Sequence, residues 1–219
     1  MLRRLARETN ASVILEFAIA LPLLLTLYIG SYTVTDLIAC NRKLGVAART
    51  LADLLARGQS PGAITASPST FNATSYMNAA VITLTPYGVA RATEDVALLR
   101  ICDATHAYVV WSQAQTQDGA GTVTATTPTE TAGKLSAASV VPIPSTLIPA
   151  GSPFIPVSPD GSNVCTNYAA STSTTTQVGT AGGYMYIGQV SYTYMPSYTY
   201  GFTSVIPLSY YVYMVPRLT

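Results

Sequence analysis

The sequence predicts an α+β protein in which one long N-terminal helix carries a small antiparallel β-sheet on its outer half. Two patterns support this fold. The first 58 residues join an apolar run to an amphipathic segment at helical spacing. Later segments are short, rich in β-branched and aromatic residues, and separated by Pro and Gly. Only 10% of the residues are charged, against roughly 25% in ordinary soluble domains, which argues against a cytoplasmic enzyme.

Residues 12–39 form the inner half of the predicted helix and are apolar enough to cross a membrane. From Phe17 to Thr35 there are 19 residues without a charge. At about 1.5 Å per residue they span roughly 29 Å, close to the thickness of a bilayer core. Pro22 lies inside this run and is expected to bend the helix, because it removes a backbone donor.

Residues 1–11 are a short basic leader containing three arginines, Arg3, Arg4 and Arg7. Positive residues stay in the cytoplasm, so we expect the N-terminus inside and everything after about residue 40 outside. A cleaved secretory signal is the alternative interpretation. Against it, the apolar run exceeds the usual 7–15 residues and no A-x-A site ends it.

Residues 40–58 form the amphipathic outer half of the helix. Apolar residues recur at i, i+3 and i+4 spacing: Leu44, Ala47, Ala48, Leu51, Leu54 and Leu55. Charged residues occupy the complementary positions, and Gly58 with Pro61 should end the helix. We expect the apolar stripe to be covered by a domain formed by residues 59–219.

Five segments of that domain are predicted to be strands. They are Ala80–Leu84, Ala97–Ile101, Tyr108–Ser112 and the alternating segment Tyr184–Tyr194, with a final strand at Ser209–Val215 after a turn containing Pro196, Gly201 and Pro207. The sheet should therefore have four or five strands. Residues 116–181 are rich in Thr, Ser, Ala and Pro and are expected to be mainly loop, since their prolines exclude a central strand.

The three cysteines suggest one disulfide. An exported domain favours pairing Cys102 with Cys165, which would close a loop of about 64 residues and stabilise the fold by roughly 4 kcal/mol. Two buried thiols are the alternative. Cys40 would be a free thiol at the membrane edge that serves mainly in packing.

No arrangement of residues predicts catalysis, a cofactor or a metal site. Cys102, Asp103 and His106 are close in sequence, but a metal needs three or four ligands and Cys102 is better used in a disulfide. No Gly-rich loop precedes a helix, and no basic stripe indicates nucleic-acid binding. The nine tyrosines between Tyr184 and Tyr213 fit either cross-strand pairing or an interaction surface, and we favour pairing.

The N-terminal segment resembles the signal of class III prepilins: a basic leader, a small residue, four more residues, then Glu16-Phe17 and an apolar helix. Residues 15–25, LEFAIALPLLL, are similar to the TadE-like minor pilins (pseudopilins) of tight-adherence pilus systems. The C-terminal part, with VSYTY at 190–194 and MVPR at 214–217, is also similar to the end of such proteins.

The resemblance implies a bacterial inner-membrane protein whose leader is cut by a prepilin peptidase between Ala11 and Ser12. The family usually has Gly at the position of Ala11. The partners it implies are this peptidase and other pilin or pseudopilin subunits, with no nucleic acid and no small-molecule substrate. The expected function is pilus assembly within a secretion apparatus and adhesion to surfaces, with an uncleaved periplasmic scaffold of the same apparatus as the alternative.

Glu16 is the residue on which this function would depend. A carboxylate at membrane depth is costly without a partner. After cleavage, the new amine of Ser12 on a neighbouring subunit would pair with it and fix the axial register of stacked helices. Otherwise Glu16 would reach the headgroup boundary beside Arg7.

Overall fold

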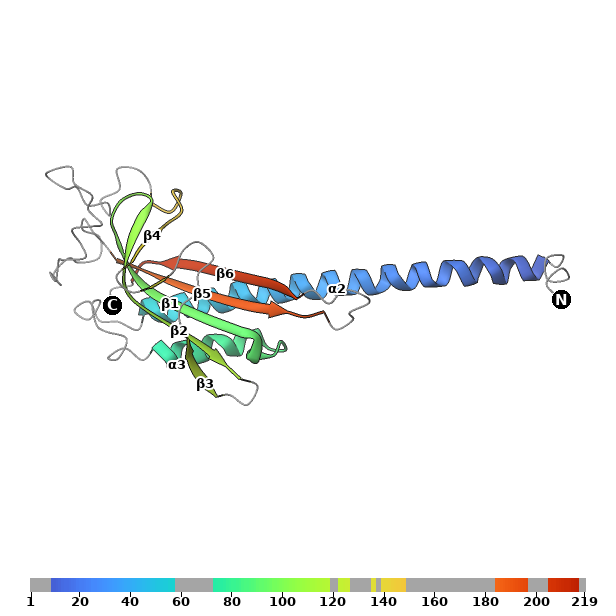
Figure 1. Ribbon diagram of the computed structural model, residues 1–219, viewed down its shortest axis with the longest axis horizontal. Coiled ribbons are helices and arrows are strands. Elements are labelled where there is room, and N and C mark those ends of the chain that lie inside the picture. The colour runs from blue at the N-terminus through green and yellow to red at the C-terminus, as the bar shows by residue number, and fades with distance from the viewer. Residues whose placement is uncertain are drawn as a thin grey trace.

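The computed structural model describes residues 9–57, 73–118, 122–126, 135–136, 139–148, 184–196 and 205–216. Its main feature is a single helix, α2 (Thr9–Arg57), of 49 residues. At 1.5 Å per residue this helix is about 74 Å long. Figure 1 shows it leaving the domain as a rod that ends near the N-terminus. The predicted helix, from Ser12 to Arg57, is thus confirmed, and it begins three residues earlier.

The domain contains one antiparallel sheet of six strands, where the sequence predicted four or five. Its order is β3-β2-β1-β5-β6, and β4 pairs with β2 beside this path. The strands are β1 (Ala92–Ile101), β2 (His106–Gln117), β3 (Val123–Thr126), β4 (Val140–Pro142), β5 (Tyr184–Tyr194) and β6 (Ile206–Met214). The predicted α+β class is therefore correct. Two predicted strands, at 97–101 and 108–112, lie within the longer β1 and β2.

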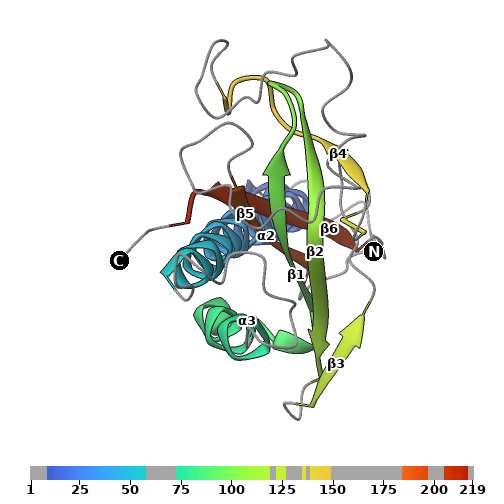
Figure 2. The ribbon, with the colours of Figure 1, turned by 90° about the vertical axis from the view of Figure 1, so that its left-hand side faces the viewer.

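The sheet has two buried faces. Alternate residues of β5, including Tyr186 and Val190, point toward α2 and join its apolar stripe in the main core. Figure 2 shows α2 and α3 (Ala73–Val81) on one side of strands β1 and β2. On the opposite face, Leu99 and Ile187 pack with Leu135, Val141 and other residues of the segment 135–148.

The stripe predicted on the outer half of α2 is confirmed. Five of its six residues, Leu44, Ala47, Ala48, Leu51 and Leu55, are fully buried. Leu54 is half-buried, and the charged residues Arg42, Lys43, Arg49 and Arg57 are exposed. The spacing of apolar residues predicts which side chains are buried here, because a helix packed on one sheet buries one continuous stripe.

The predicted strand Ala80–Leu84 is wrong. Its residues end α3 and form the short 3₁₀ helix η1 (Ile82–Leu84), and a second one, η2 (Val89–Arg91), precedes β1. A short apolar run fits a buried helix as well as a strand, and only packing decides between them. Here Met77, Ala80 and Leu84 belong to the core with α2.

One prediction based on proline is wrong. Pro207 was placed in the turn before the last strand, but it lies inside β6, opposite Thr193. β6 is at the edge of the sheet, where a missing backbone donor is tolerated. Residues 116–181 contain β3 and β4 as well as loop, and Pro142 ends β4 opposite His106. β4 pairs with β2 alone among the described strands, so Pro142 does not occupy a central strand.

Candidate functional site

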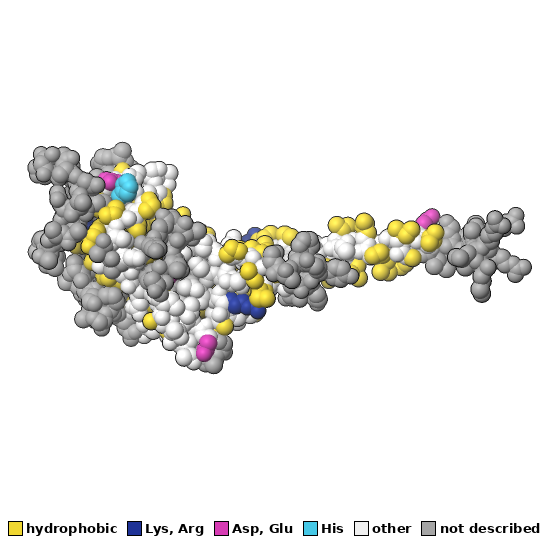
Figure 3. All heavy atoms as spheres, in the orientation of Figure 1, with side chains coloured by type: hydrophobic (Ala, Val, Ile, Leu, Met, Phe, Trp, Pro, Cys, Tyr) yellow, Lys and Arg dark blue, Asp and Glu magenta, His cyan; other side chains and the backbone are white. Residues whose placement is uncertain are grey.

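The N-terminal half of α2 is exposed on all sides. Leu15, Phe17, Ile19, Leu23 and Leu27 are each between 63% and 68% exposed. Figure 3 shows apolar side chains along this rod. By length and composition, α2 is a helix that could cross a membrane, and none of its most apolar stretch is buried within the protein. Burial begins at Cys40, the first residue of the helix with no exposed surface.

Asp36 lies at the junction between these halves and is held by two tyrosines from distant parts of the chain. Tyr87 donates its hydroxyl to Asp36 Oδ1 at 2.9 Å, and to the Asp36 carbonyl at 3.1 Å. Tyr194, at the end of β5, donates to Asp36 Oδ2 at 2.6 Å. Both carboxylate oxygens are therefore bonded, and the helix is fixed against β5 and the loop before β1.

The two tyrosines are neutral donors in this arrangement. Burial raises the pKa of both Tyr87 and Tyr194, and their hydrogen bonds to Asp36 and its charge raise it further. The ring of Tyr87 also meets Tyr192 edge-on, with centroids 6.2 Å apart. Hydrogen bonds to a carboxylate are stronger than neutral ones, so this cluster is a strong contact at the point where the exposed helix begins.

Small residues bring α2 and the sheet together further along. A Cβ on Gly188 of β5 would lie 3.2 Å from the backbone nitrogen of Ala52 and 3.4 Å from the carbonyl oxygen of Ala48. A Cβ on Gly45 would lie 3.5 Å from the ring of Tyr210 on β6. The Tyr210 hydroxyl also accepts a bond of 3.5 Å from Arg49. These contacts set the distance between helix and sheet.

A buried polar group lies beneath the helices. The Gln115 amide donates to Glu94 Oε2 at 2.7 Å and to Asn78 Oδ1 on α3 at 2.9 Å. Glu94 is 3% exposed. Burial raises the pKa of its carboxyl to about 8; the bond from Gln115 opposes this rise and neighbouring Asp95 adds to it. Glu94 is therefore mostly protonated at neutral pH.

The residues predicted for processing lie on the exposed helix. Ala11 and Ser12 fall in its first turns, and Pro22 lies inside it without ending it. The side chains of Glu16 and Phe17 are exposed. The described structure does not test the roles of these residues, which remain predictions.

The cysteine predictions agree with the structure as far as it describes them. Cys102 is disulfide-bonded. Cys40 is a free thiol, buried in the main core, as expected for a packing residue. Cys165 lies outside the described residues, so its pairing with Cys102 stays a prediction.

His106 is exposed at the start of β2 and contacts Asp103, with Nδ1 3.1 Å from each carboxylate oxygen. Partial burial raises the pKa of Asp103, but hydrogen bonds from Thr105 and His106 outweigh it and lower the pKa overall. Within the described part of the chain, no group of three or more His, Cys, Asp or Glu side chains could hold a metal ion.

The tyrosine-rich C-terminal part is mainly core. Tyr184, Tyr186, Tyr192 and Tyr194 are buried, and the first of these stacks under Arg100 at 5.6 Å. Tyr211 is 43% exposed and pairs edge-on with Tyr213. These four rings belong to the main core, but their partners on β1 and β6 are not aromatic, so the predicted cross-strand aromatic pairing is not seen for them. The turn residues Tyr198, Tyr200 and Phe202 lie outside the described ranges.

Sequence reasoning missed Asp36 and Glu94. Asp36 is the first charge after the apolar run, which marks the boundary but does not indicate its tyrosine partners. Glu94 lies in a strand whose neighbours are Thr93 and Asp95, so nothing in the pattern predicts burial. No protein-family profile, curated protein or solved structure matches this chain.

Proposed function

We propose that this protein is a membrane-anchored minor pilin or pseudopilin of a tight-adherence-type pilus apparatus. In this proposal the leader before Ser12 is cytoplasmic, α2 crosses the bacterial inner membrane, and the sheet domain lies in the periplasm. The protein assembles with other pilin-type subunits and contributes to pilus formation and surface attachment. It carries out no chemistry itself.

One observation supports this proposal most: a single helix has one half exposed and apolar and the other half buried against an antiparallel sheet. An isolated apolar helix is unstable in water, so its exposed half requires lipid or neighbouring helices. A permanent anchor and a stacking pilin helix both meet this requirement. The prepilin-like segment around Glu16 favours the second.

The intact mass of the membrane-extracted protein separates the two alternatives. We expect a chain beginning at Ser12 when the cognate prepilin peptidase is present, and the full leader when it is absent. An uncut chain in both cases would support the permanent periplasmic scaffold. A chain beginning beyond residue 30 would show a secretory signal and contradict both.

Glu16 provides the second test. We expect Glu16→Ala to leave membrane insertion intact and to reduce incorporation into pili at least tenfold, because the buried pair with the Ser12 amine is lost. Pili sheared from cells and quantified by immunoblot give the measurement. Asp53→Ala removes a carboxylate from the same helix outside the apolar half and should assemble normally. Normal assembly of Glu16→Ala would disprove the stacking role.

A further inference from the structure

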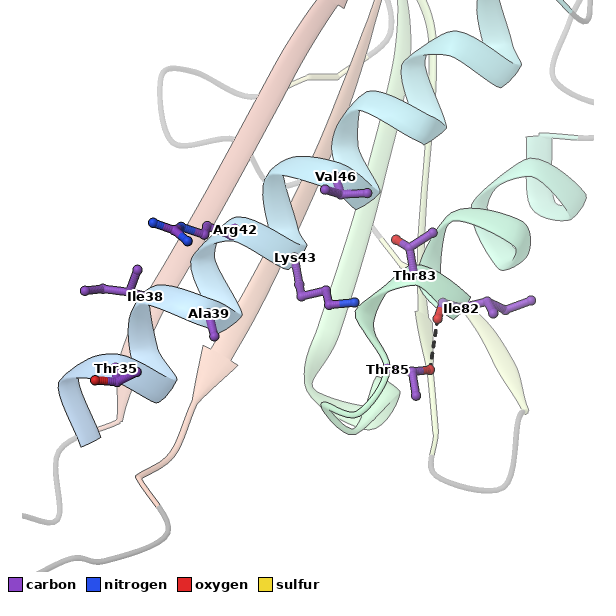
Figure 4. Close-up of a pocket in the computed structure, with 9 residues that line it drawn as sticks. All are labelled: Thr35, Ile38, Ala39, Arg42, Lys43, Val46, Ile82, Thr83 and Thr85. Carbon is purple, nitrogen blue, oxygen red and sulfur yellow. Dashed lines mark hydrogen bonds between the residues drawn. The ribbon is translucent and has the colours of Figure 1, made fainter. Parts of the chain in front are cut away.

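A groove lies between α2 and η1, just beyond the exposed half of the helix. Its volume is about 710 Å³. One wall is formed by Thr35, Ile38, Ala39, Arg42, Lys43 and Val46 of α2, and the other by Ile82, Thr83 and Thr85. Figure 4 shows Lys43 extending toward η1, whereas Arg42 extends from the other side of the helix.

The groove is cationic and partly apolar. Two positive side chains line it, and no Asp or Glu is among its described lining residues. The hydroxyls of Thr83 and Thr85 donate to the carbonyls of Ala80 and Ile82, at 2.7 and 2.9 Å. Ile82 is 69% exposed, Ile38 49% and Val46 51%, so apolar carbon remains uncovered beside the two charges.

The position of the groove along α2 matches a membrane surface. If residues 17–35 span the bilayer core, Asp36 marks its outer boundary. Arg42 and Lys43 follow about 9–11 Å further along the axis. The headgroup layer is roughly 5–8 Å deep on each side, and long cationic side chains reach back toward it. Both charges therefore lie within reach of lipid phosphates.

We propose that this groove binds an anionic phospholipid, with the phosphate beside Lys43 and the acyl chains directed along α2 toward its exposed half. A free phosphate has no group to cover Ile38 and Ile82, whereas a phospholipid supplies both the charge and the apolar tail. The inference rests on the membrane anchoring proposed above, but not on cleavage or assembly into a pilus.

Lipid photo-crosslinking tests this site directly. The full-length protein is reconstituted into phosphatidylcholine vesicles that contain either phosphatidylglycerol or phosphatidylcholine with a diazirine near the headgroup. Chymotryptic digestion avoids the tryptic sites at Arg42 and Lys43. We expect labelling of residues 35–46 and 82–85 to be about fivefold higher with the anionic lipid, since one cation near an anionic surface contributes about 1 kcal/mol.

In the double variant R42Q/K43Q, the ratio of labelling by the anionic lipid to labelling by the neutral lipid should fall to about one. The matched control, R49Q/R57Q, removes two charges from the same helix further from the membrane and should keep most of the preference. Equal labelling by both lipids, or a preference unchanged in R42Q/K43Q, would overturn the site. Cross-links from Lys43 to a second copy, with equal lipid labelling, would assign the groove to self-association instead.

Membrane anchoring is measured separately on the same vesicles by an alkaline carbonate wash. A protein that washes off would contradict the anchoring and with it both proposals. A protein that stays in the vesicles but shows no lipid preference would contradict only the groove inference. Retention with the expected preference supports the lipid site even where the leader is uncut.

Discussion

Glu94 is the residue whose charge state most affects the fold. Its Oε1 and the Oε1 of Gln115 are both buried, and neither has a hydrogen-bond partner among the described residues. A protonated carboxyl supplies a donor that an ionised one lacks, and Gln115 Oε1 is an acceptor that needs one. The neutral acid therefore suits this position, and ionisation would leave a buried charge beside Asp95.

The stability of the protein should consequently depend on pH. The pKa of Glu94 rises from 4.5 to about 8 on folding, so the folded state holds a proton that the unfolded state releases. The stabilisation is complete below pH 4.5 and is lost as pH rises through about 8. The total change is on the order of 5 kcal/mol, at 1.36 kcal/mol per pKa unit. Thermal unfolding in detergent between pH 4.5 and 8.5 measures it.

Glu94→Gln mimics the protonated acid and should flatten this pH dependence, with a higher melting temperature than the wild type at pH 8.5. Asp118→Asn, at an exposed position, is the control and should keep the wild-type slope. A Glu94→Gln protein that loses stability with pH as steeply as the wild type would show that another group titrates.

Asp36 should contribute to stability through its two tyrosines. Asp36→Ala removes both acceptors, and we expect a loss of about 2–3 kcal/mol in the free energy of unfolding, since a hydrogen bond to a charged group contributes about 1.5–3 kcal/mol. Asp36→Asn keeps one acceptor oxygen and should lose about half as much. Denaturant titration measures the free energy of unfolding of both variants. The control is Asp53→Asn, whose carboxylate forms a surface pair with Arg57; this variant should change the free energy of unfolding by under about 0.5 kcal/mol. Equal effects of the Asp36 and Asp53 variants would rule out the tyrosine contacts.

At the scale of elements, the close approach of α2 and β5 depends on small side chains. Gly188 faces Ala48 and Ala52, and the nearest atoms to an added Cβ include the helix backbone. Backbone cannot move aside as a flexible side chain can. The pairing of β5 with β1 and β6 on its two sides also holds the strand in place.

Gly188→Val should therefore force the helix from the sheet. We expect a loss of about 2–3 kcal/mol or more in the free energy of unfolding, at the upper end of overpacking effects. Thr193→Val, at an exposed position on the other face of the same strand, is the matched control and should be nearly neutral. Adding Ala52→Gly should recover only part of the loss, because the backbone contact remains. Chemical denaturation of the three variants tests this, and a neutral Gly188→Val would contradict the close contact.

At the scale of the whole molecule, the helix has two separable parts. Among residues 15–57 of α2, every buried residue lies at or beyond Cys40, and the Asp36 contacts lie just before it. The apolar half makes no core of its own within the described chain. Folding of the domain should therefore not require the first 34 residues.

A chain beginning at Thr35 should keep the fold, with a melting temperature within a few degrees of the full protein, and should no longer fractionate with membranes. A chain beginning at Leu51 loses Leu44, Ala47 and Ala48 from the core and should not fold. Circular dichroism and membrane fractionation give the two measurements. An unfolded chain from Thr35 would show that the exposed half stabilises the domain.

Patterns along the chain were enough to predict the helix, its apolar half, the buried stripe from Leu44 to Leu55 and the strand Tyr184–Tyr194. These features repeat at the period of one element, so each residue's environment follows from its neighbours in sequence. Only tertiary packing decided four other features. They are the helical character of Ala80–Leu84, the position of Pro207 inside an edge strand, the hydrogen bonds of Tyr87 and Tyr194 to Asp36, and the burial of Glu94. Each depends on contacts between residues that are distant in sequence. The local spacing of apolar residues does not predict which distant residues come into contact.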